Sequence, residues 1–402
     1  MQSTRADNAA NLVVRHGRVM DPARGIDAIL DVVIKDGHIQ ALVEPSEEYS
    51  CPEIDASGKL VVPGMIDLHT HVYWGGSSIS IRLEDHLIRS GVTTWVDAGS
   101  AGAGNFKAFK QYSIDLSPVR ILAFLNISFA GIFGCMNLES GDFESGWVGD
   151  LCDLRLANIS EAVSMSEAYP QTIVGIKIRA GFSGCDQPGL EPVKIAKQAA
   201  EAIQKPLMVH IGFAPPTTGE LLATLQKGDV LTHAFREDPN SMLENSTIPL
   251  AELFDARERG VLLDIGHGAG SFSFTAAKTL LSHGIQPDII SSDLHAVSVN
   301  GPAYDLPTTM SKMLMLGMPL KDVIHAVTAR PASVLGLEQE LGTLAPGTAA
   351  DITVLELEAG RFEFQDCFGN VRKSESRLKP TDLIFGGSVI CRSGASTLRP
   401  KN

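Results

Sequence analysis

Apolar runs alternate with stretches of helical spacing through the middle of this 402-residue chain, and this alternation strongly constrains the fold. The runs are TTWVDAG, ILAFLNIS, IVGIKIR, LMVHIG, DVLTHAF, VLLDIGHG and DIISSDLH, and EPVKIAKQAAEAIQK is one of the helical stretches between them. Continuous apolar strands that alternate with amphipathic helices indicate a parallel sheet buried on both faces. Seven or eight such units across about 275 residues favour a (β/α)8 barrel over a doubly wound sheet.

Strands separated by turn residues are expected at both ends of the chain. Near the N-terminus, β-branched runs are separated by Gly, Asp and Pro, and Asp36-Gly37 fits a tight hairpin turn. Residues 342–357, GTLAPGTAADITVLEL, repeat this pattern. We therefore predict an α/β chain in which residues 65–340 form a TIM-like barrel. Residues 1–64 and 341–402 would together build a small β-sandwich domain from both chain termini.

Composition excludes several classes of protein. Hydrophobic residues make up 44% of the chain, which is too many for a disordered protein, and the net charge of -14 without a basic run argues against nucleic acid as a partner. The apolar runs are too short for a membrane span, and the N-terminus lacks the apolar region of a secretory signal. The six cysteines contain no CxxC pair and fit a reducing compartment. We expect a cytoplasmic protein without a membrane or nucleic-acid partner.

Polar residues end or closely follow several of the apolar runs. Because the carboxyl ends of barrel strands meet at one face, we expect these side chains to converge there. His69 and His71 are two positions apart, so a strand would direct both imidazoles to the same side. The set consists of His69, His71, Lys177, His210, His233 and Asp293.

Each of these residues also has an ordinary structural interpretation. A single buried histidine is more often a hydrogen-bonded core residue than a metal ligand, Lys177 could be paired or reach solvent, and Asp293 could cap a helix. Neutral imidazole is a good ligand for a divalent metal such as zinc, and a catalytic metal needs about three protein ligands and an open position. Their joint placement at successive strand ends favours a metal site.

The motifs PGMIDLHTH, a lysine on a middle strand, two later single histidines and a late SSD resemble the amidohydrolase superfamily. The resemblance implies a (β/α)8 barrel with a small β-sandwich from both termini. It also implies two divalent metal ions: His69, His71 and Asp293 would bind the more buried ion, and His210 and His233 the second. Lys177, carboxylated to a carbamate, would bridge the two ions as an anionic oxygen ligand.

The chemistry that follows from this resemblance is hydrolysis. Two cations would polarise a scissile carbonyl and supply a metal-bridged hydroxide at neutral pH. Asp293 is the predicted catalytic residue: as a proton shuttle it would take the proton of the hydroxide and pass it to the leaving group. Zinc is the first candidate for the metal, although manganese and other ions suit the same ligands.

Further stretches, including HVYWGGSSISIR, GIKIRA, DIGHGAGSFSF and SSDLH, resemble a dihydroorotase-like group of deacetylases similar to acetyl-(R)-mandelate deacetylases. The resemblance implies removal of an acyl group, acetyl first, from a small carboxylate-bearing amide or ester. Dihydroorotases usually carry an arginine two places after HxH to hold the substrate carboxylate. Tyr73 occupies that position here.

Four residues are therefore candidates for contact with substrate. Arg179, two residues beyond Lys177, would face the same side of its strand, and a salt bridge at the barrel rim is an equally good interpretation. Tyr73 would line a pocket or cover the barrel top. His267 would contact a substrate carbonyl, support a ligand or serve a structural role, and His295 would orient the substrate or Asp293.

Two other functions compete with this prediction. The first is a cyclic amidohydrolase of the dihydroorotase or hydantoinase kind. The second is an inactive barrel that acts as a binding protein, against which the complete set of six site residues argues. The expected partner is a small-molecule acylated carboxylate, and the oligomeric state, including a homo-oligomer, stays open.

Overall fold

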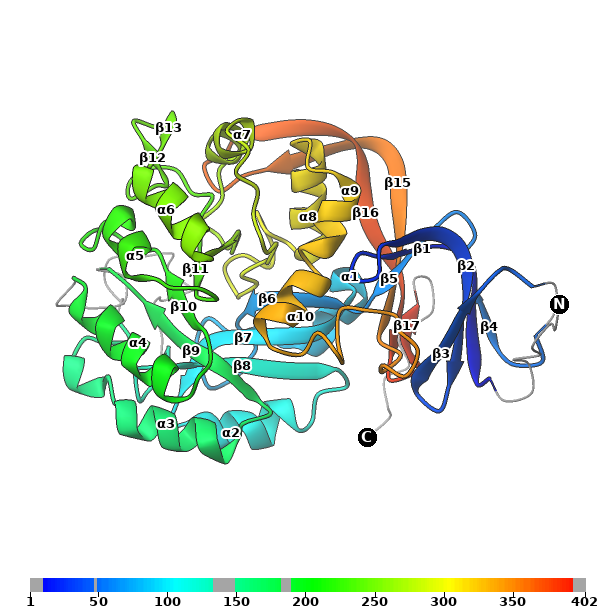
Figure 1. The fold of residues 1–402 in the computed structure, drawn as a ribbon, viewed down its shortest axis with the longest axis horizontal. Coiled ribbons are helices and arrows are strands. Elements are labelled where there is room, and N and C mark those ends of the chain that lie inside the picture. The colour runs from blue at the N-terminus through cyan, green and yellow to red at the C-terminus, as the bar shows by residue number, and fades with distance from the viewer. Residues whose placement is uncertain (1–9, 47–48, 133–148, 182–188, 393–402) are drawn as a thin grey trace.

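The computed structural model of the chain describes residues 10–46, 49–132, 149–181 and 189–392. Within these residues the chain forms a parallel sheet surrounded by helices and a second sheet built from both ends of the chain (Figure 1). The second sheet lies beside the first (Figure 1). This arrangement confirms the predicted fold class.

The parallel sheet has seven strands in the order β14-β11-β10-β9-β8-β7-β6. Their residues are almost all buried, because helices and loops cover the outer face and side chains fill the inner one. The strands are β6 (Met65–Thr70), β7 (Val92–Gly102), β8 (Arg120–Asn126), β9 (Ile173–Arg179), β10 (Leu207–His210), β11 (Val230–Thr232) and β14 (Leu262–Asp264).

Residues 289–294 occupy the place of an eighth strand between β14 and β6. Single parallel bridges join Asp264 to Ile289 on one side and Thr70 to Leu294 on the other. The backbone N–H of His71 donates to the carbonyl of Leu294 at 3.0 Å, which ties this segment to the end of β6. The segment DIISSDLH therefore closes the barrel as expected, although its pairing is too sparse for a continuous strand.

The helices flank the parallel sheet on its outer side (Figure 1). Several begin with a side chain that accepts a backbone N–H: Thr217 and Glu220 form a capping box, and Asp305 accepts from Thr308. The bounds are α1 (Leu87–Ser90), α2 (Phe106–Phe109), α3 (Ile159–Ala168), α4 (Glu191–Ala202), α5 (Thr218–Thr224), α6 (Ala251–Arg259), α7 (Phe274–Ser282), α8 (Leu306–Met315), α9 (Leu320–His325) and α10 (Ala329–Val334).

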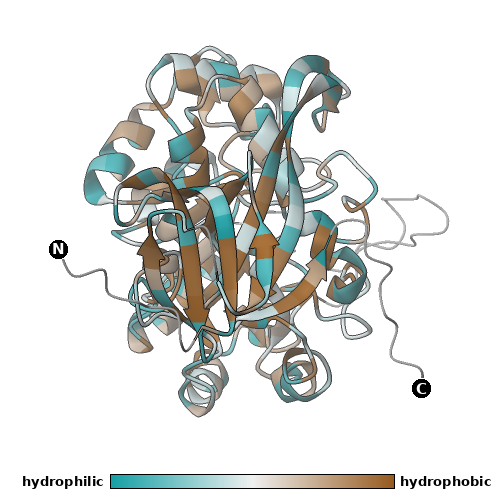
Figure 2. Cartoon of the chain, turned by 90° about the vertical axis from the view of Figure 1, so that its right-hand side faces the viewer, coloured by the Kyte–Doolittle hydropathy of each residue, from teal (hydrophilic) through white to brown (hydrophobic). Residues whose placement is uncertain are grey.

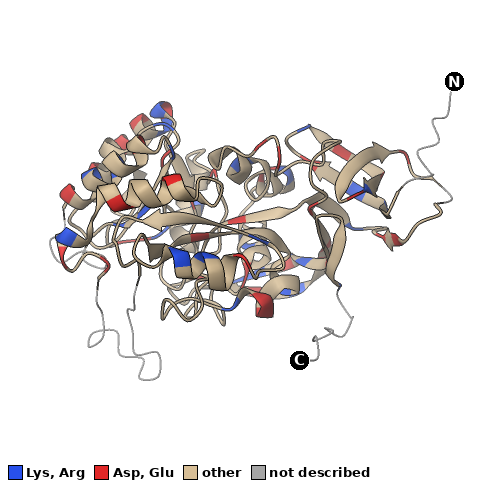
Figure 3. Cartoon of the chain, turned by 90° about the horizontal axis from the view of Figure 1, so that it is seen from below, with Lys and Arg blue, Asp and Glu red and all other residues tan. Residues whose placement is uncertain are grey.

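Short irregular elements complete this part of the chain. They are the 3₁₀ turns η1 (Leu83–His86) and η3 (Leu154–Leu156), the π turn η2 (Lys110–Ile114), and a small hairpin of β12 (Leu243–Glu244) and β13 (Ile248–Pro249). Acidic and basic residues of the barrel lie mainly on its helices and loops, whereas the strands of the parallel sheet carry few charges (Figure 3). None of the helices in the described ranges is long and apolar enough to span a bilayer.

The second sheet joins the two ends of the chain through β5 and β15, which pair in antiparallel fashion. Its main order is β17-β16-β15-β5-β1-β2-β3, and β4 pairs with β1. Apolar residues alternate with polar ones along several of its strands (Figure 2). The strands are β1 (Leu12–Asp21), β2 (Ile26–Lys35), β3 (His38–Val43), β4 (Glu53–Asp55), β5 (Leu60–Pro63), β15 (Ile352–Gln365), β16 (Val371–Phe385) and β17 (Ser388–Arg392).

Local details of this second sheet follow from the sequence. Asp36 and Gly37 form the predicted turn between β2 and β3 with φ angles of 50° and 78°, which a glycine adopts without steric cost. The tip of the long β15–β16 hairpin contacts the barrel, since the N–H of Cys367 donates to the carbonyl of Phe272 at 3.0 Å. The division of the chain at residues 64 and 340 stays a prediction.

Candidate metal centre

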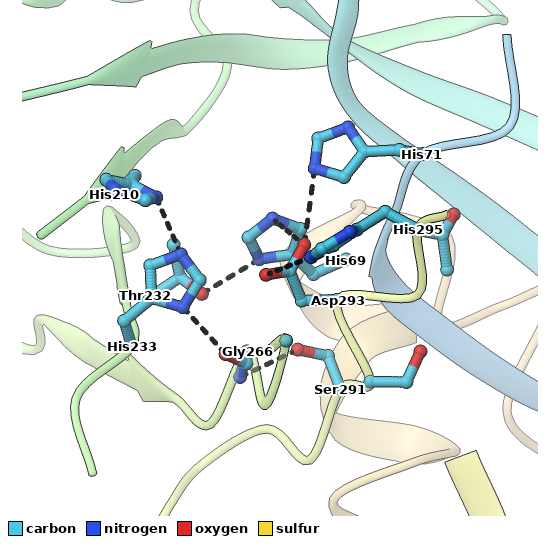
Figure 4. A network of polar contacts seen from close by, with 12 residues as sticks. His69, His71, His210, Thr232, His233, Gly266, Ser291, Asp293 and His295 are labelled. Atoms are coloured by element: carbon cyan, nitrogen blue, oxygen red, sulfur yellow. Dashed lines mark hydrogen bonds and ion pairs between the residues drawn. The ribbon is translucent and has the colours of Figure 1, made fainter. Parts of the chain in front are cut away.

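The fold brings the six predicted ligands together at the carboxyl ends of the barrel strands. Figure 4 shows five of them, all except Lys177. His69 lies on β6 and His71 directly follows it, Lys177 lies on β9, and His210 ends β10. His233 follows β11, and Asp293 lies on the segment that closes the barrel. All of them are buried except His210, which is partly exposed.

The carboxylate of Asp293 lies between the two imidazoles of the HxH pair. Its Oδ1 atom is 3.3 Å from Nε2 of His69 and 3.2 Å from Nε2 of His71. Two ligands with metal bonds of about 2.0–2.1 Å in tetrahedral geometry are separated by roughly 3.3 Å, so this spacing suits a shared cation. Oδ1 is also buried without a hydrogen-bond partner. These three side chains therefore fit a divalent metal ion.

A second group of donors adjoins the first. Nε2 of His233 lies 2.7 Å from Nδ1 of His210, and Nζ of Lys177 lies 3.3 Å from Nε2 of His69. Ligand atoms of His69, His233 and Asp293 all lie within 4.8 Å of one another. The lysine thus stands beside the first donor group, and the two groups are contiguous.

Hydrogen bonds to the other ring nitrogen orient the histidines. Nδ1 of His233 lies 2.6 Å from the carbonyl of Gly266, which only accepts, so this nitrogen carries the proton and Nε2 keeps a lone pair. Nδ1 of His69 lies 2.9 Å from Oγ1 of Thr232, and that hydroxyl donates to Asp264 at 2.6 Å. Nδ1 of His69 must therefore donate to Thr232, which leaves Nε2 as the ligand atom.

The third ring, that of His71, has a hydroxyl partner of the same kind. Its Nδ1 lies 2.9 Å from Oγ of Ser100, and Ser100 is held by Asp97, which accepts from the backbone N–H of Ser100 at 2.7 Å. Asp97 also accepts from the backbone N–H of Val72 at 2.9 Å. One buried carboxylate thereby fixes the end of β6 and the partner of His71 together.

Backbone conformation at two of the ligands is unusual. His233 has a φ of 70° and Asp293 a φ of 46°, both in the left-handed region that non-glycine residues seldom adopt. A side chain at Gly268 would meet Oδ2 of Asp293 at 2.4 Å, and one at Gly266 would meet Nδ1 of His233 at 2.9 Å. Both glycines are needed because the backbone of this loop passes directly against the two ligands.

Burial sets the protonation of these groups. Desolvation is the main cause that lowers the pKa of His233 to about 3, and it holds those of His69 and His210 well below their ordinary value. It also lowers the pKa of Lys177 to about 8, which makes a neutral amine accessible near physiological pH. Burial alone would raise the pKa of Asp293, but the surrounding imidazoles, His69 foremost, hold it well below its ordinary range. The cluster therefore presents neutral nitrogen donors and one carboxylate.

Several supporting residues were missed by the sequence analysis. Asp264 accepts from Thr232 and from Ser291 at 2.6 Å each, and burial raises its pKa to about 6. Asp67 accepts from the backbone N–H of Ser292 at 3.0 Å and so attaches the closing segment to β6. Asp67 and Asp264 lie in the quoted motifs MIDLHTH and VLLDIGHG, where a carboxylate within an apolar run was the available signal.

The structure places Arg179 in the salt bridge that was the alternative to substrate binding. Nε of Arg179 donates to Oδ2 of Asp150 at 2.9 Å, and a second bond links Nη2 to Oδ1. The same carboxylate accepts from the side-chain amide of Asn126 at 3.1 Å. The charge of Arg179 is thus already balanced inside the protein, and contact with substrate stays a prediction.

The other three substrate candidates differ in their surroundings. His295 joins the cluster, with Nε2 3.9 Å from Oδ2 of Asp293. Tyr73 is buried and packs its ring 4.7 Å from that of Phe109, and its contact with substrate stays a prediction. His267 is fully buried, and both its ring nitrogens are engaged by neighbours: Nδ1 by the carbonyl of Gly268 at 3.0 Å and Nε2 by Nζ of Lys312 at 2.7 Å. Its contact with a substrate carbonyl stays a prediction.

Comparison with known proteins identifies the family of this chain. Residues 60–390 match the amidohydrolase family model. A deacetylase of Brucella anthropi is 38% identical over 374 residues, covering 91% of this chain and 89% of its own, and a deacetylase of Agrobacterium fabrum is 39% identical over 345 residues, covering 85% and 81%. A crystal structure described as a dihydroorotase superposes with a TM-score of 0.85 at 35% identity over 96% of this chain and 98% of its own. The chain belongs to the amidohydrolase family and is a hydrolase.

Proposed function

We propose that this chain is a binuclear metal-dependent hydrolase that removes an acyl group, acetyl first, from a small amide or ester that carries a carboxylate. The observation that carries the proposal is the position of Asp293, whose buried and unbonded Oδ1 lies at ligand spacing from His69 and His71. His210 and His233 supply the second donor group, and Lys177 reaches the first from β9. The names of the two deacetylases described above support the choice of acyl group.

Two divalent metal ions held by these residues would supply an activated water and would polarise the acyl carbonyl. His69, His71 and Asp293 would hold one ion, His210 and His233 the other, and a carboxylated Lys177 would contact both. Zinc is the first candidate because neutral imidazole and carboxylate form its usual ligand set.

Asp293 is the residue proposed to transfer the proton. Its depressed pKa keeps the carboxylate ionised at neutral pH, so it can accept a proton from the attacking water. The same carboxylic acid then donates that proton to the nitrogen or oxygen of the leaving group. His295, 3.9 Å from Oδ2, would keep the carboxylate turned toward the substrate, and the fixed rings of His69 and His71 hold its other oxygen.

The test is a substrate screen joined to metal analysis on the same sample. N-acetyl-D- and N-acetyl-L-amino acids are compared with acetylated 2-hydroxy acids, and zinc and manganese are quantified before and after chelation. We expect about two metal ions per chain and release of acetate that stops on chelation and returns with added metal. Acetate release that persists after complete metal removal would refute the proposal.

A cyclic amidohydrolase is the second candidate, and the likeness to the structure described as a dihydroorotase favours it. Tyr73 at the second position after HxH, where dihydroorotases usually carry arginine, speaks against dihydroorotate itself. Reversible opening of dihydroorotate or a hydantoin, without hydrolysis of acyclic acetyl compounds, would establish this alternative. A protein that binds no stoichiometric metal and hydrolyses neither class would instead be a binding protein.

A further inference from the structure

One buried arginine near the candidate metal centre, Arg236, has no ion-pair partner among the described residues: burial lowers its pKa, and the nearby Asp238 offsets this only in part. Arg236 lies three residues after His233 in the loop that follows β11, and it is only 8% exposed. Arg179, the other buried arginine of this region, is paired with Asp150, whereas Arg236 forms no ion pair with any carboxylate in the described part of the chain. A buried guanidinium without a carboxylate is unfavourable in a finished core, because desolvation is not offset by an opposite charge.

The hydrogen bonds of Arg236 leave most of its donors unused. Nη1 donates to the carbonyl of Ile211 at 2.8 Å, and Nε is buried without a partner. A guanidinium has five N–H groups, so a single bond within the described residues leaves a fork of donors for a planar anion. Phe213, half exposed, lies with its ring centre 5.7 Å from the guanidinium carbon and covers one side of it.

The neighbours of Arg236 place it at the mouth of the barrel. Ile211 directly follows the ligand His210, so the bond to its carbonyl connects the loops that carry both ligands of the second donor group. The charge of Arg236 acts on His233, where it adds to burial in lowering the pKa of that imidazole. Burial lowers the pKa of Arg236, and the nearby Asp238 and Cys367 oppose this effect. Sγ of Cys367 lies 3.7 Å from the carbonyl of Gly268, in the loop against Asp293.

We propose that Arg236 is the specificity-determining residue that receives the carboxylate of the acylated substrate, with N–H groups of its two Nη atoms as the donor pair. This inference rests on the proposed function, since it names the group by which the substrate is recognised. A substrate carboxylate bound there would pair with Arg236 as Asp150 pairs with Arg179. It would also place the acyl group beside the proposed metal ligands. Compounds that carry a neutral amide in place of the carboxylate leave the guanidinium unpaired.

The test compares a pair of substrates that differ only in charge, an N-acetyl amino acid and its primary amide, in the metal-loaded enzyme. Arg236→Met is expected to raise KM for the acid about 10- to 100-fold, because a hydrogen bond to a charged group contributes about 1.5–3 kcal/mol and each 1.4 kcal/mol is tenfold. In the same variant, the KM for the amide should differ from the wild-type value by less than about threefold. Arg236→Lys keeps the charge but loses the planar pair of donors. Its KM for the acid should lie between the values of the wild type and of Arg236→Met.

Two further variants control for general effects. Arg82→Met removes an exposed arginine whose guanidinium carbon also lies 5.7 Å from an aromatic ring, that of Trp74, and it should leave both KM values unchanged. Arg179→Met removes the paired arginine and should affect the acid and the amide equally. If Arg179→Met, rather than Arg236→Met, discriminates the acid from the amide, Arg236 is not the carboxylate receptor.

A binding measurement separates this inference from the proposed reaction. Calorimetric titration of N-acetylglycine and N-acetylglycinamide into metal-loaded protein should show a preference for the acid that disappears in Arg236→Met, with metal content and melting temperature measured on the same samples. If the protein prefers the acid through Arg236 yet hydrolyses neither compound, the proposed hydrolysis is refuted. The role of Arg236 as the carboxylate receptor would still be supported. If both compounds are hydrolysed but Arg236→Met weakens the binding of both equally, or if neither is preferred, Arg236 does not receive the carboxylate. The proposed hydrolysis would be unaffected by that result.

Discussion

The hydroxyl of Thr232 lies 2.9 Å from Nδ1 of His69 and donates a hydrogen bond to the carboxylate of Asp264, 2.6 Å away. This chain of hydrogen bonds fixes the proton of His69 on Nδ1 and leaves Nε2 as the donor to a cation. It joins β6, β11 and β14, so the tautomer of the ligand depends on the register of three strands. On the proposed function, this buried threonine would support the metal site as well as the core.

Replacing Thr232 with valine keeps the volume of the side chain but removes both hydrogen bonds. We expect Thr232→Val to bind zinc about 10- to 100-fold more weakly, as is usual when the partner of a metal-bound histidine is lost. Competition with a chelator measures the affinity, and Thr232→Ser, which keeps the hydroxyl, is the control. Equal affinity in the valine variant and the wild type would show that this hydroxyl does not orient His69.

Carboxylation of Lys177 should depend on pH in a defined direction. The carbamate forms from the neutral amine, and burial lowers the pKa of Lys177 to about 8. In chain loaded with isotope-labelled bicarbonate, the carbamate signal in carbon NMR should therefore increase as pH rises through about 8 and disappear in Lys177→Met. We expect kcat/KM of Lys177→Met to fall more than about 100-fold. Even the loss of a residue that only hydrogen-bonds to a metal ligand lowers metal affinity or activity about 10- to 100-fold.

Another buried lysine provides the control for this experiment. Lys312 is also fully buried with a pKa lowered to about 7, but Nζ donates to Nε2 of His267 and to the carbonyl of Pro302, at 2.7 and 2.8 Å. Lys312→Met should keep the carbamate signal. A signal that persists in Lys177→Met and vanishes in Lys312→Met would move the modification away from the metal centre.

The sequence predicted the barrel, the two-ended sheet and the convergence of six site residues because strand ends of a parallel barrel meet at one face. It could not predict which buried polar residues support these ligands, since Thr232, Ser100 and Asp264 act through contacts between strands far apart in the chain. The partner of Arg179 was equally hidden, because Asp150 reaches it from a separate loop. Periodicity indicates which side of a strand a residue occupies, but not what faces it.

The eighth strand position shows a second limit of sequence patterns. DIISSDLH has the apolar start of a strand, yet only single bridges hold it, and Asp67 takes the place of backbone pairing by accepting from Ser292. This irregular backbone lets Asp293 adopt a φ of 46° and turn its carboxylate between His69 and His71. Hydrophobic alternation alone does not reveal such a departure from regular pairing.

Asp293→Asn tests proton transfer apart from metal binding. The amide keeps the shape and one oxygen of the carboxylate but cannot carry the proton, and general acid–base catalysis contributes about 10²–10⁴-fold. We expect kcat to fall by that factor while at least one metal ion stays bound, measured by stopped assays and metal analysis. A variant with the wild-type kcat would exclude Asp293 as the proton shuttle.

Lys312 should make the stability of the metal-free protein depend on pH. Its folded pKa of about 7 is below the value of about 10.4 for an unfolded lysine, so between these values the unfolded chain binds more protons. Unfolding free energy should thus rise with pH across this window, by up to about 1.4 kcal/mol per pH unit from this group. In Lys312→Met this contribution is absent, so the difference between wild type and variant in chemical denaturation should itself increase from pH 7 toward pH 10. A difference that stays constant or shrinks over this range would show that Lys312 is not held as a buried neutral amine against His267.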